Sequence, residues 1–386
     1  MPEILPSQRD AFDIPREIAY LNCAYVSPFS HKVIAAGASG IAAKVRPWTL
    51  TTEDFFAPPD RVRRLAAGLL GGNPADYAFV PAASYGIACA ALNLPLKAGQ
   101  DIVLLEEQFP SNVYSWQRAA AQAGAGIRIV TRAEARVSGN ALDWAAAIEA
   151  AITPSTAIVA TPHCHWADGS LVDLKRVSAA CRKVGAALVL DLSQSAGALP
   201  VDLADTGADF AAIAAYKWLT GPYSLSLLYV APHRQNGQPL EENWINREGS
   251  EDFAGLVDYV DAYQPGAQRF DMGERANFHL MPMLEAALGQ LLEWGVPEIA
   301  ATLAEKTARI AAEAETLGFT SVPAHARAGH FLGLSRKEGL PENLVKRLAA
   351  DNVFVSVRGT SIRATPHLYN DEEDVARFFA ALKKCL

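Results

Sequence analysis

Seven short apolar runs, most of them separated by segments with helical periodicity, constrain the fold of this chain most strongly. We expect strands at residues 77–80, 101–105, 127–130, 156–160, 187–191, 209–213 and 225–230. Helical patterns lie between many of them, at residues 85–94, 112–123, 141–152 and 174–184. This alternation predicts an α/β fold with a mostly parallel, seven-stranded sheet that helices cover on both faces. Functional residues of such sheets lie at the carboxyl ends of the strands.

The character of the sequence changes after residue 230. Residues 233–268 are polar and lack clear periodicity, and a long helical region begins near Met281. Within it, Ile299 and Leu303 share one face of a helix that Pro297 can begin and Gly318 can end. Strand and helix patterns then alternate at residues 330–334, 342–351, 353–358, 361–364 and 372–382. We therefore expect a large domain of residues 16–270 and a smaller α+β domain formed by residues 1–15 and 271–386.

Composition and charge argue against several classes of function. The net charge is −8 and no cluster of Lys and Arg is present, so no nucleic-acid partner is expected. No stretch approaches the roughly 18 apolar residues of a membrane span, and the N-terminus lacks the apolar run of a signal peptide. The five cysteines are scattered and form no C-x-x-C, so we expect neither disulfides nor a metal site. These features predict a cytoplasmic protein without a membrane partner.

A lysine at the end of a predicted buried strand is the main candidate for chemistry. Residues 188–222 are LVLDLSQSAGALPVDLADTGADFAAIAAYKWLTGP. Asp191 ends one strand, Gln194 follows three residues later, and Lys217 follows the next strand. A lysine in such a place is costly unless it is paired, neutral or used covalently. An isolated strand-end lysine usually extends to the surface, but its spacing from Asp191 and Gln194 favours a functional role.

This segment resembles the cofactor region of the class V aminotransferase superfamily, which includes cysteine desulfurases, kynureninases and isopenicillin N epimerase-like proteins. Their shared pattern is D-x-x-Q followed by a lysine about one βαβ unit later. The resemblance implies the pyridoxal 5′-phosphate (PLP)-dependent transferase fold type I, with PLP bound to Lys217 as a Schiff base. It also implies that Asp191 pairs with the protonated pyridine nitrogen and that Gln194 hydrogen-bonds the 3′-oxygen of the ring. A carboxylate raises the pKa of that nitrogen, which keeps the ring an electron sink.

Further residues match the cofactor contacts of the superfamily. In FVPAASYGIACAALNL, Ala83 and Ser84 stand at the start of a predicted helix, where free backbone N–H groups can bind phosphate. Ser84 can also be the N-cap of that helix, and an ordinary cap is the alternative role. Tyr216 resembles the kynureninase tyrosine that contacts phosphate, whereas Ala214 replaces a phosphate-binding serine of many desulfurases. Phe109 stands where desulfurases stack a histidine on the ring; it can stack but cannot transfer protons, and a core role is its alternative.

Two segments match the substrate side of the superfamily's active site. In GTSIRATPHLYNDEEDV, Arg363 stands where the superfamily places the arginine that binds the substrate α-carboxylate. A structural or surface arginine is the alternative, and Arg358 is a second candidate. In TPHCHWADGS, Trp166 replaces a substrate-contacting Asn of desulfurases. Two His and one Cys in that segment are too few for a zinc site, so we expect His165 or Trp166 to shape the substrate pocket.

The resemblance leaves the reaction open. No Cys lies between Ala350 and Arg363, where desulfurases carry their catalytic Cys, so a persulfide-forming enzyme is not expected. We expect a PLP-dependent aminotransferase that acts on an amino acid, with Lys217 moving the Cα proton. A kynureninase-like or cysteine/selenocysteine lyase is the main alternative, and an amino-acid epimerase is the third. A nicotinamide oxidoreductase is disfavoured because PAASYG does not supply G-x-G-x-x-G.

The resemblance also implies a homodimer whose active site lies at the subunit interface. The segment at residues 266–277 matches the part of the superfamily that crosses to the partner subunit. Glu274 replaces the threonine that usually reaches the partner's phosphate, which leaves Arg275 and Asn277 as candidates.

Overall fold

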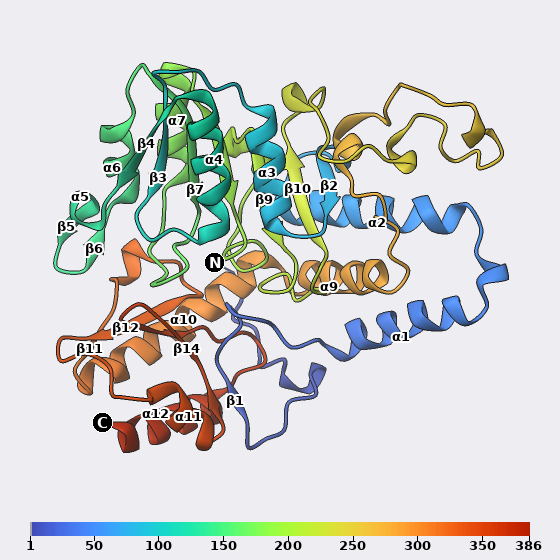
Figure 1. Cartoon of the computed structure of the whole chain (residues 1–386). Coiled ribbons are helices and arrows are strands. Elements are labelled where there is room, and N and C mark those ends of the chain that lie inside the picture. The colour runs from blue at the N-terminus through green and yellow to red at the C-terminus, as the bar shows by residue number, and fades with distance from the viewer. Residues whose placement is uncertain (1) are drawn as a thin grey trace.

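The central sheet of the computed structural model, which describes residues 2–386, has the seven strands that the sequence predicts (Figure 1). Their order is β2-β10-β9-β8-β7-β3-β4. The strands are β2 (Tyr77–Val80), β3 (Asp101–Leu105), β4 (Gly126–Val130), β7 (Thr156–Pro162), β8 (Ala187–Asp191), β9 (Phe210–Ala214) and β10 (Ser226–Val230). Neighbouring strands are parallel except around β10, which is antiparallel to both β2 and β9. The prediction of a mostly parallel seven-stranded sheet is confirmed.

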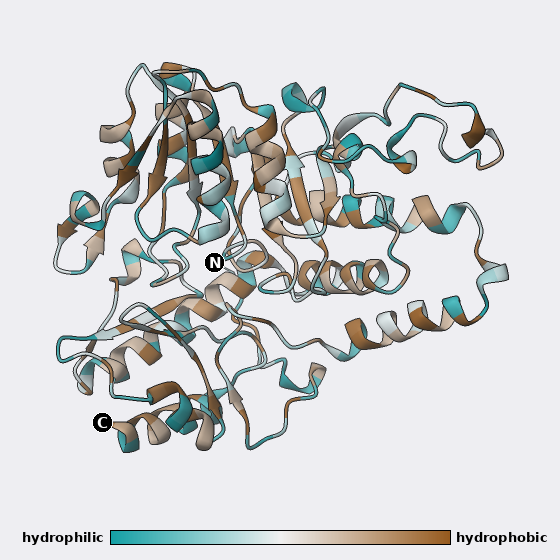
Figure 2. Cartoon of the chain, viewed as in Figure 1, coloured by the Kyte–Doolittle hydropathy of each residue, from teal (hydrophilic) through white to brown (hydrophobic). Residues whose placement is uncertain are grey.

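Helices cover both faces of this sheet. On one face lie α3 (Ala83–Asn93) and α4 (Tyr114–Ala123), and their core includes Ile87 and Trp116. On the other face lie α2 (Glu53–Leu70), α6 (Trp144–Ala151), α7 (Leu174–Val184) and α9 (Leu280–Trp294). Because both faces are covered, central strands such as β8 and β9 are almost entirely apolar, and Figure 2 shows several strands in the hydrophobic colour.

Two long helices that the sequence patterns above do not predict precede the sheet. They are α1 (His31–Val45) and α2, which contains Pro58 and Pro59 in its interior. Both pack against α9. A Cβ atom on Gly40 of α1 would collide with the backbone of Phe278 and His279, so glycine permits this close approach. Packing on α9 therefore supports helices whose own sequences favour helix weakly.

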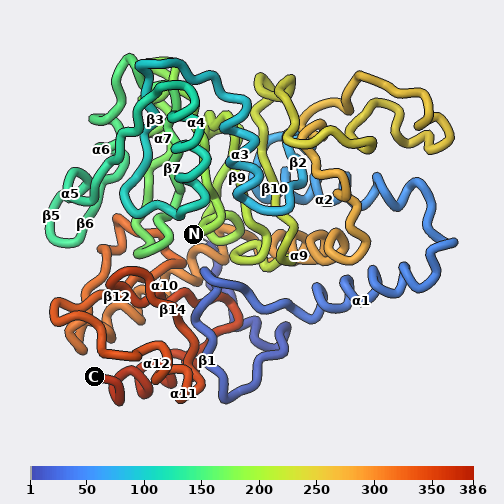
Figure 3. The backbone as a smooth tube through the Cα atoms, viewed as in Figure 1, coloured from blue at the N-terminus to red at the C-terminus, as the bar shows by residue number. Residues whose placement is uncertain are grey.

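The C-terminal third forms a smaller α+β layer below the sheet in Figure 1. Its antiparallel sheet has the order β11-β12-β15-β14. Its elements are α10 (Val296–Thr316), β11 (Phe319–Thr320), β12 (Leu332–Arg336), α11 (Leu344–Ala350), β13 (Val353–Phe354), β14 (Ser356–Arg358), β15 (Ser361–Ala364) and α12 (Glu372–Cys385). The N-terminal strand β1 (Ala19–Tyr20) pairs with β13, and Figure 3 shows this early segment beside the C-terminal part.

The remaining elements are short. They are α5 (Arg132–Ala135), the hairpin of β5 (Arg136–Ser138) and β6 (Ala141–Leu142), and α8 (Leu203–Thr206). The polar residues 233–268 form turns and brief 3₁₀ helices, such as Trp244–Asn246 and Gly255–Val257. Among the described residues, no helix has both the length and the apolar character needed to cross a membrane.

Contacts within the chain link some segments to the large sheet and others to the C-terminal layer, but they do not define exact domain boundaries. Ala19 and Leu21 belong to the apolar core of the C-terminal layer, and Arg9 forms a buried ion pair of 2.7 Å with Asp374 of α12. Leu284 of α9, by contrast, belongs to the core under the large sheet. The boundaries at residues 16 and 270 stay a prediction.

Candidate active site

The predicted cofactor residues meet in one cavity at the carboxyl edge of the large sheet. They lie at the end of β8, in the segments that follow β3, β7, β8 and β9, and in the first turn of α3, which follows β2. The cavity measures about 190 Å³, and its wall includes Ala83, Ser84, Phe109, Trp166, Asp191, Gln194, Tyr216 and Lys217. Because parallel strands end at the same edge, residues far apart in the sequence reach one place.

Lys217 follows β9, is only 7% exposed and faces this cavity. Its Nζ atom lies 5.3 Å from the ring centroid of Phe109 and 5.5 Å from that of Tyr216. Within residues 2–386 no carboxylate pairs with it at ion-pair distance. Burial lowers the pKa of Lys217 to about 8, and Asp191 opposes this shift. An amine with this pKa is partly neutral near physiological pH and can act as a nucleophile.

Asp191 and Gln194 follow β8 and offer hydrogen-bonding groups to the same cavity. One oxygen of Asp191 accepts a hydrogen bond of 3.0 Å from the backbone N–H of Ser193, while its other oxygen has no partner among the described residues. The amide of Gln194 donates to the carbonyl of Ala24 at 3.1 Å and accepts from the indole of Trp218 at 2.9 Å. These bonds fix the side chain and leave one amide hydrogen for a ligand.

The start of α3 presents free backbone donors to the cavity. The N-cap of α3 is Ala82, so the expectation that Ser84 caps the helix is wrong. Ser84 instead lies in the first turn, where its N–H and that of Ala83 have no acceptor among residues 2–386. A Cβ atom on Gly86 would lie 3.1 Å from the Cβ of Ala212 in β9, so glycine lets the helix start lie close to the sheet. This arrangement suits a phosphate group.

Four serines of the cavity wall are absent from the sequence prediction: Ser111, Ser193, Ser224 and Ser226. Ser226 is directly opposite Ala214 in the β9–β10 pair, beside the position where a phosphate-binding serine is missing. The alternation of serine and leucine at residues 224–228 is a sequence signal for this. This signal can be interpreted only when it is known that β10 lies next to β9.

Trp166 and Arg363, the two residues expected to contact the substrate, lie together beside the cavity. The ring of Trp166 meets that of Phe109 edge-on, with centroids 5.3 Å apart, and its indole donates to the carbonyl of Glu107 at 2.7 Å. Arg363 is 1% exposed and lies next to Trp166 rather than in the cavity wall. It donates to the carbonyl of Trp166 at 3.1 Å and to the hydroxyl of Ser356 at 2.9 Å.

The electrostatic environment of Arg363 is unusual because no carboxylate of the described chain pairs with it. Burial, together with the nearby charge of Arg358, lowers the pKa of Arg363 to about 9. His165, the other expected pocket residue, is buried against Trp144 and does not line the cavity. Of those two expectations, the structure therefore supports Trp166.

The predicted cross-subunit candidates are engaged within the chain to different degrees. Arg275 is buried and forms an ion pair of 2.6 Å with Asp271. The side-chain oxygen of Asn277 accepts from the N–H of Leu280 at 3.0 Å, at the start of α9. Glu274 is exposed. Asn277, which keeps its amide hydrogens, is the freer of the two candidates.

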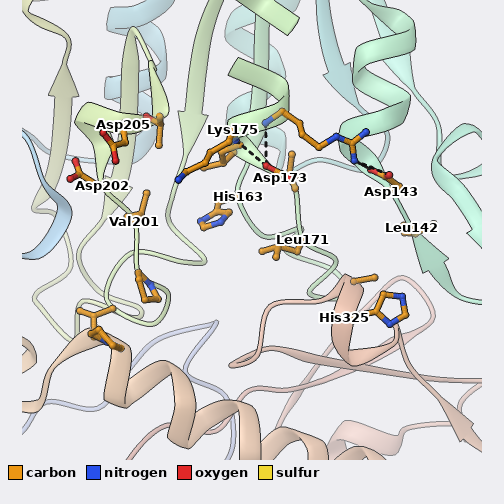
Figure 4. A pocket seen from close by; sticks show the side chains of 18 of the residues that line it. Leu142, Asp143, His163, Leu171, Asp173, Lys175, Val201, Asp202, Asp205 and His325 are labelled. Atoms are coloured by element: carbon orange, nitrogen blue, oxygen red, sulfur yellow. Dashed lines mark hydrogen bonds and ion pairs between the residues drawn. The ribbon is translucent and has the colours of Figure 1, made fainter. Parts of the chain in front are cut away.

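A larger hollow of about 1080 Å³ lies elsewhere, and Figure 4 shows it. Asp173 caps α7 there, and Arg176 pairs with Asp143 at 2.9 Å. His163 faces this hollow and not the cavity of Lys217. Because none of the predicted site residues lines it, we assign the chemistry to the smaller cavity.

A model of the family described as Aminotransferase class-V matches residues 42–378, which is most of the chain. The chain belongs to the class V aminotransferase family. Enzymes of this family use pyridoxal phosphate, so the expectations of an enzyme and of this cofactor are confirmed. The residues present fit the group: a buried amine, a carboxylate with a free oxygen and a helix start with free N–H groups share one cavity.

Individual relatives of this chain differ in their described activities. It is 26% identical over 313 residues to the uncharacterised aminotransferase YcbU of Bacillus subtilis, covering 80% of this chain and 79% of that protein. It is 30% identical over 285 residues to a kynureninase of Deinococcus radiodurans, covering 70% and 64%. A cysteine desulfurase structure from Thermococcus onnurineus superposes with a TM-score of 0.83 at 19% identity, covering 100% and 99%. This likeness confirms the expected fold.

Proposed function

We propose that this protein converts an amino acid by transamination, with pyridoxal phosphate held by Lys217. The observation that carries the proposal is the buried, unpaired amine of Lys217, with its pKa lowered to about 8, in a cavity that Asp191 also lines. Asp191 would bind the pyridine nitrogen and Gln194 the ring oxygen. Phe109 would stack on the ring. Ala83, Ser84 and Tyr216 would hold the phosphate.

The residues of the chain divide the work of proton transfer and positioning. Pyridoxal phosphate, when bound, withdraws electrons from the α-carbon of an amino acid. The Lys217 amine would take the proton from that carbon and return it at a different position. A base is most effective when its pKa lies near the working pH, and a pKa of about 8 meets that condition. Phe109 cannot supply a second base on the other ring face, which disfavours epimerisation.

A kynureninase-like Cα–Cβ lyase is the second candidate. Tyr216 lines the cavity, and burial raises its pKa to about 12, so its phenol stays protonated and can donate a proton to a leaving carbon. Persulfide chemistry is less favoured. All five cysteines are buried, and burial raises the pKa of Cys164, which lines the cavity, well above its ordinary value.

We also propose that the protein is a homodimer. Large apolar side chains are exposed on and after α1 and in the loop before residue 262, among them Ile41, Val45, Trp48, Val257 and Tyr259. Figure 1 shows both segments at the same end of the molecule. An edge-on contact between Phe55 and Trp244, with centroids 6.2 Å apart, joins the start of α2 to that loop. Exposed apolar surface of this extent favours association with a second copy.

A screen of single amino acids with the holoenzyme tests the proposed reaction. The cofactor absorbance is followed with and without a 2-oxo acid acceptor, and the products are identified by mass spectrometry. Transamination gives the 2-oxo acid with the substrate's carbon skeleton, whereas a lyase gives a shorter amino acid. The Lys217→Ala variant is the control and should turn over none of them. The proposal fails if no amino acid changes the cofactor absorbance of the wild-type protein.

A further inference from the structure

Two arginines without carboxylate partners converge on Trp166. In the β14–β15 hairpin, Ser356 is opposite Arg363 and Arg358 is opposite Ser361. Arg358 and Arg363 are therefore diagonal neighbours on the same face, at a separation of about 7–8 Å that long side chains can bridge. Their Cζ atoms lie 5.6 and 5.8 Å from the ring centroid of Trp166. Within residues 2–386 neither guanidinium forms an ion pair.

Arg358 lines a second cavity that adjoins the cavity of Lys217. This second cavity measures about 550 Å³, and Gln108 and Trp166 belong to the walls of both. Arg358 is half-buried, and its guanidinium donates a hydrogen bond of 2.8 Å to the carbonyl of Val357. Most of its N–H groups are therefore available to a ligand that reaches past Trp166.

Arg132, in the wall of the same cavity, is an arginine whose charge is neutralised by carboxylates of the fold. Its guanidinium pairs with Glu107 at 2.7 Å and with Asp168 at 2.5 Å. Among the described residues, Arg358 has no such partner. The contrast between the two arginines indicates that the charge of Arg358 serves to bind a ligand and not to stabilise the fold.

Both arginines act on the reacting amine. Arg363 and Arg358 each lower the pKa of Lys217, whereas Asp191 is the carboxylate that raises it. Because the α-carboxylate of a substrate can pair with one guanidinium, the other guanidinium stays available for a second anionic group of the same substrate.

We propose that Arg358 determines substrate specificity by binding an oxyanion at the end of the substrate's side chain, while Arg363 binds the α-carboxylate. The preferred substrates are then amino acids with an acidic side chain, and Trp166 lies between their two anionic groups. This inference rests on the proposed function and names its substrate class. Arg358 is a specificity-determining residue in this account, because it would contact the substrate away from the reacting carbon.

Matched acid and amide substrates test the inference. Aspartate and glutamate are compared with asparagine and glutamine, and kcat/KM is obtained from the change in cofactor absorbance. The wild-type protein should prefer the acids by about tenfold or more, because one charge-assisted hydrogen bond has about that effect. Arg358→Gln should remove this preference while leaving kcat/KM for the amides within about threefold. Arg136→Gln, which changes an exposed arginine in the same cavity wall, should leave the preference intact.

Binding of unreactive acids gives a second readout that does not depend on turnover. Calorimetry on the holoenzyme should show succinate binding about tenfold more tightly than butyrate, and Arg358→Gln should equalise the two. The inference is overturned if succinate and butyrate bind alike, or if Arg358→Gln weakens acids and amides equally. In those cases conversion of any amino acid to its 2-oxo acid still upholds the proposed function. Absence of all turnover would refute that function, while the succinate comparison would still decide the role of Arg358.

Discussion

Replacement of Arg363 by lysine separates the loss of geometry from the loss of charge. The guanidinium of Arg363 donates one N–H to the hydroxyl of Ser356 and one to the carbonyl of Trp166. Its other N–H groups are therefore available to bind a carboxylate. Lysine keeps the charge but cannot hold these bonds and a parallel pair to the substrate at once. Loss of one charge-assisted bond of about 1.5–3 kcal/mol should lower kcat/KM roughly tenfold to a hundredfold or more.

The stability of this variant should change much less than its activity. Lysine keeps the buried positive charge, so the desolvation cost of the charge remains, and the fold loses at most the two hydrogen bonds of Arg363 to Ser356 and Trp166. Steady-state kinetics, thermal unfolding and the cofactor absorbance are measured together, with Arg128→Lys as the surface control. Arg363→Ala should lose more activity and still bind the cofactor. A kcat/KM of Arg363→Lys within twofold of the wild-type value, or loss of the cofactor, would refute the reasoning.

Three further predictions follow from the same geometry. The rate at which the apoenzyme takes up pyridoxal phosphate should rise with pH and level off above about 8, because Lys217 reacts only as the neutral amine. A rate that continues to rise up to about pH 10 would indicate a lysine with an ordinary pKa. The Cys164→Ala variant should keep most of its activity, and the wild-type protein incubated with free cysteine should carry no persulfide, since no cysteine residue of the chain is exposed. Loss of turnover in a folded, cofactor-bound Cys164→Ala variant would indicate a nucleophilic thiol. Light scattering at micromolar concentration should give twice the mass of the chain, and Trp48→Glu should weaken that dimer whereas Val137→Glu should not; a monomeric wild-type holoenzyme would contradict the proposal.

The large sheet could be predicted because burial on both faces makes its central strands nearly continuous apolar runs. Residues 187–191, ALVLD, show this clearly. Helices α1 and α2 could not be predicted in the same way, because Pro58 and Pro59 oppose helix locally and Gly40 lowers helix propensity. Their contacts with α9 decide their structure, and those contacts join distant parts of the chain.

The residues of the candidate site also fall into two groups: those predictable from local sequence and those placed by contacts between distant parts of the chain. Asp191, Gln194 and Lys217 could be predicted from their spacing, because each follows a strand of one sheet. Ser226 could not, since its place opposite Ala214 depends on the β9–β10 pairing.

The surroundings of Arg363 depend on distant contacts as well. Its burial beside Trp166, and the convergence of Arg358 on the same ring, result from packing between loops and the C-terminal hairpin. Such packing has no signature in short motifs.

Borohydride reduction of the purified protein, followed by peptide mapping, tests the central claim most directly. The wild-type protein should absorb in the visible range as isolated and, after reduction, carry the cofactor on the peptide that contains Lys217. Lys217→Ala should fold and carry no reduced cofactor on any lysine. A label on another lysine, such as Lys175 in the wall of the larger hollow, would contradict the assignment of the active site.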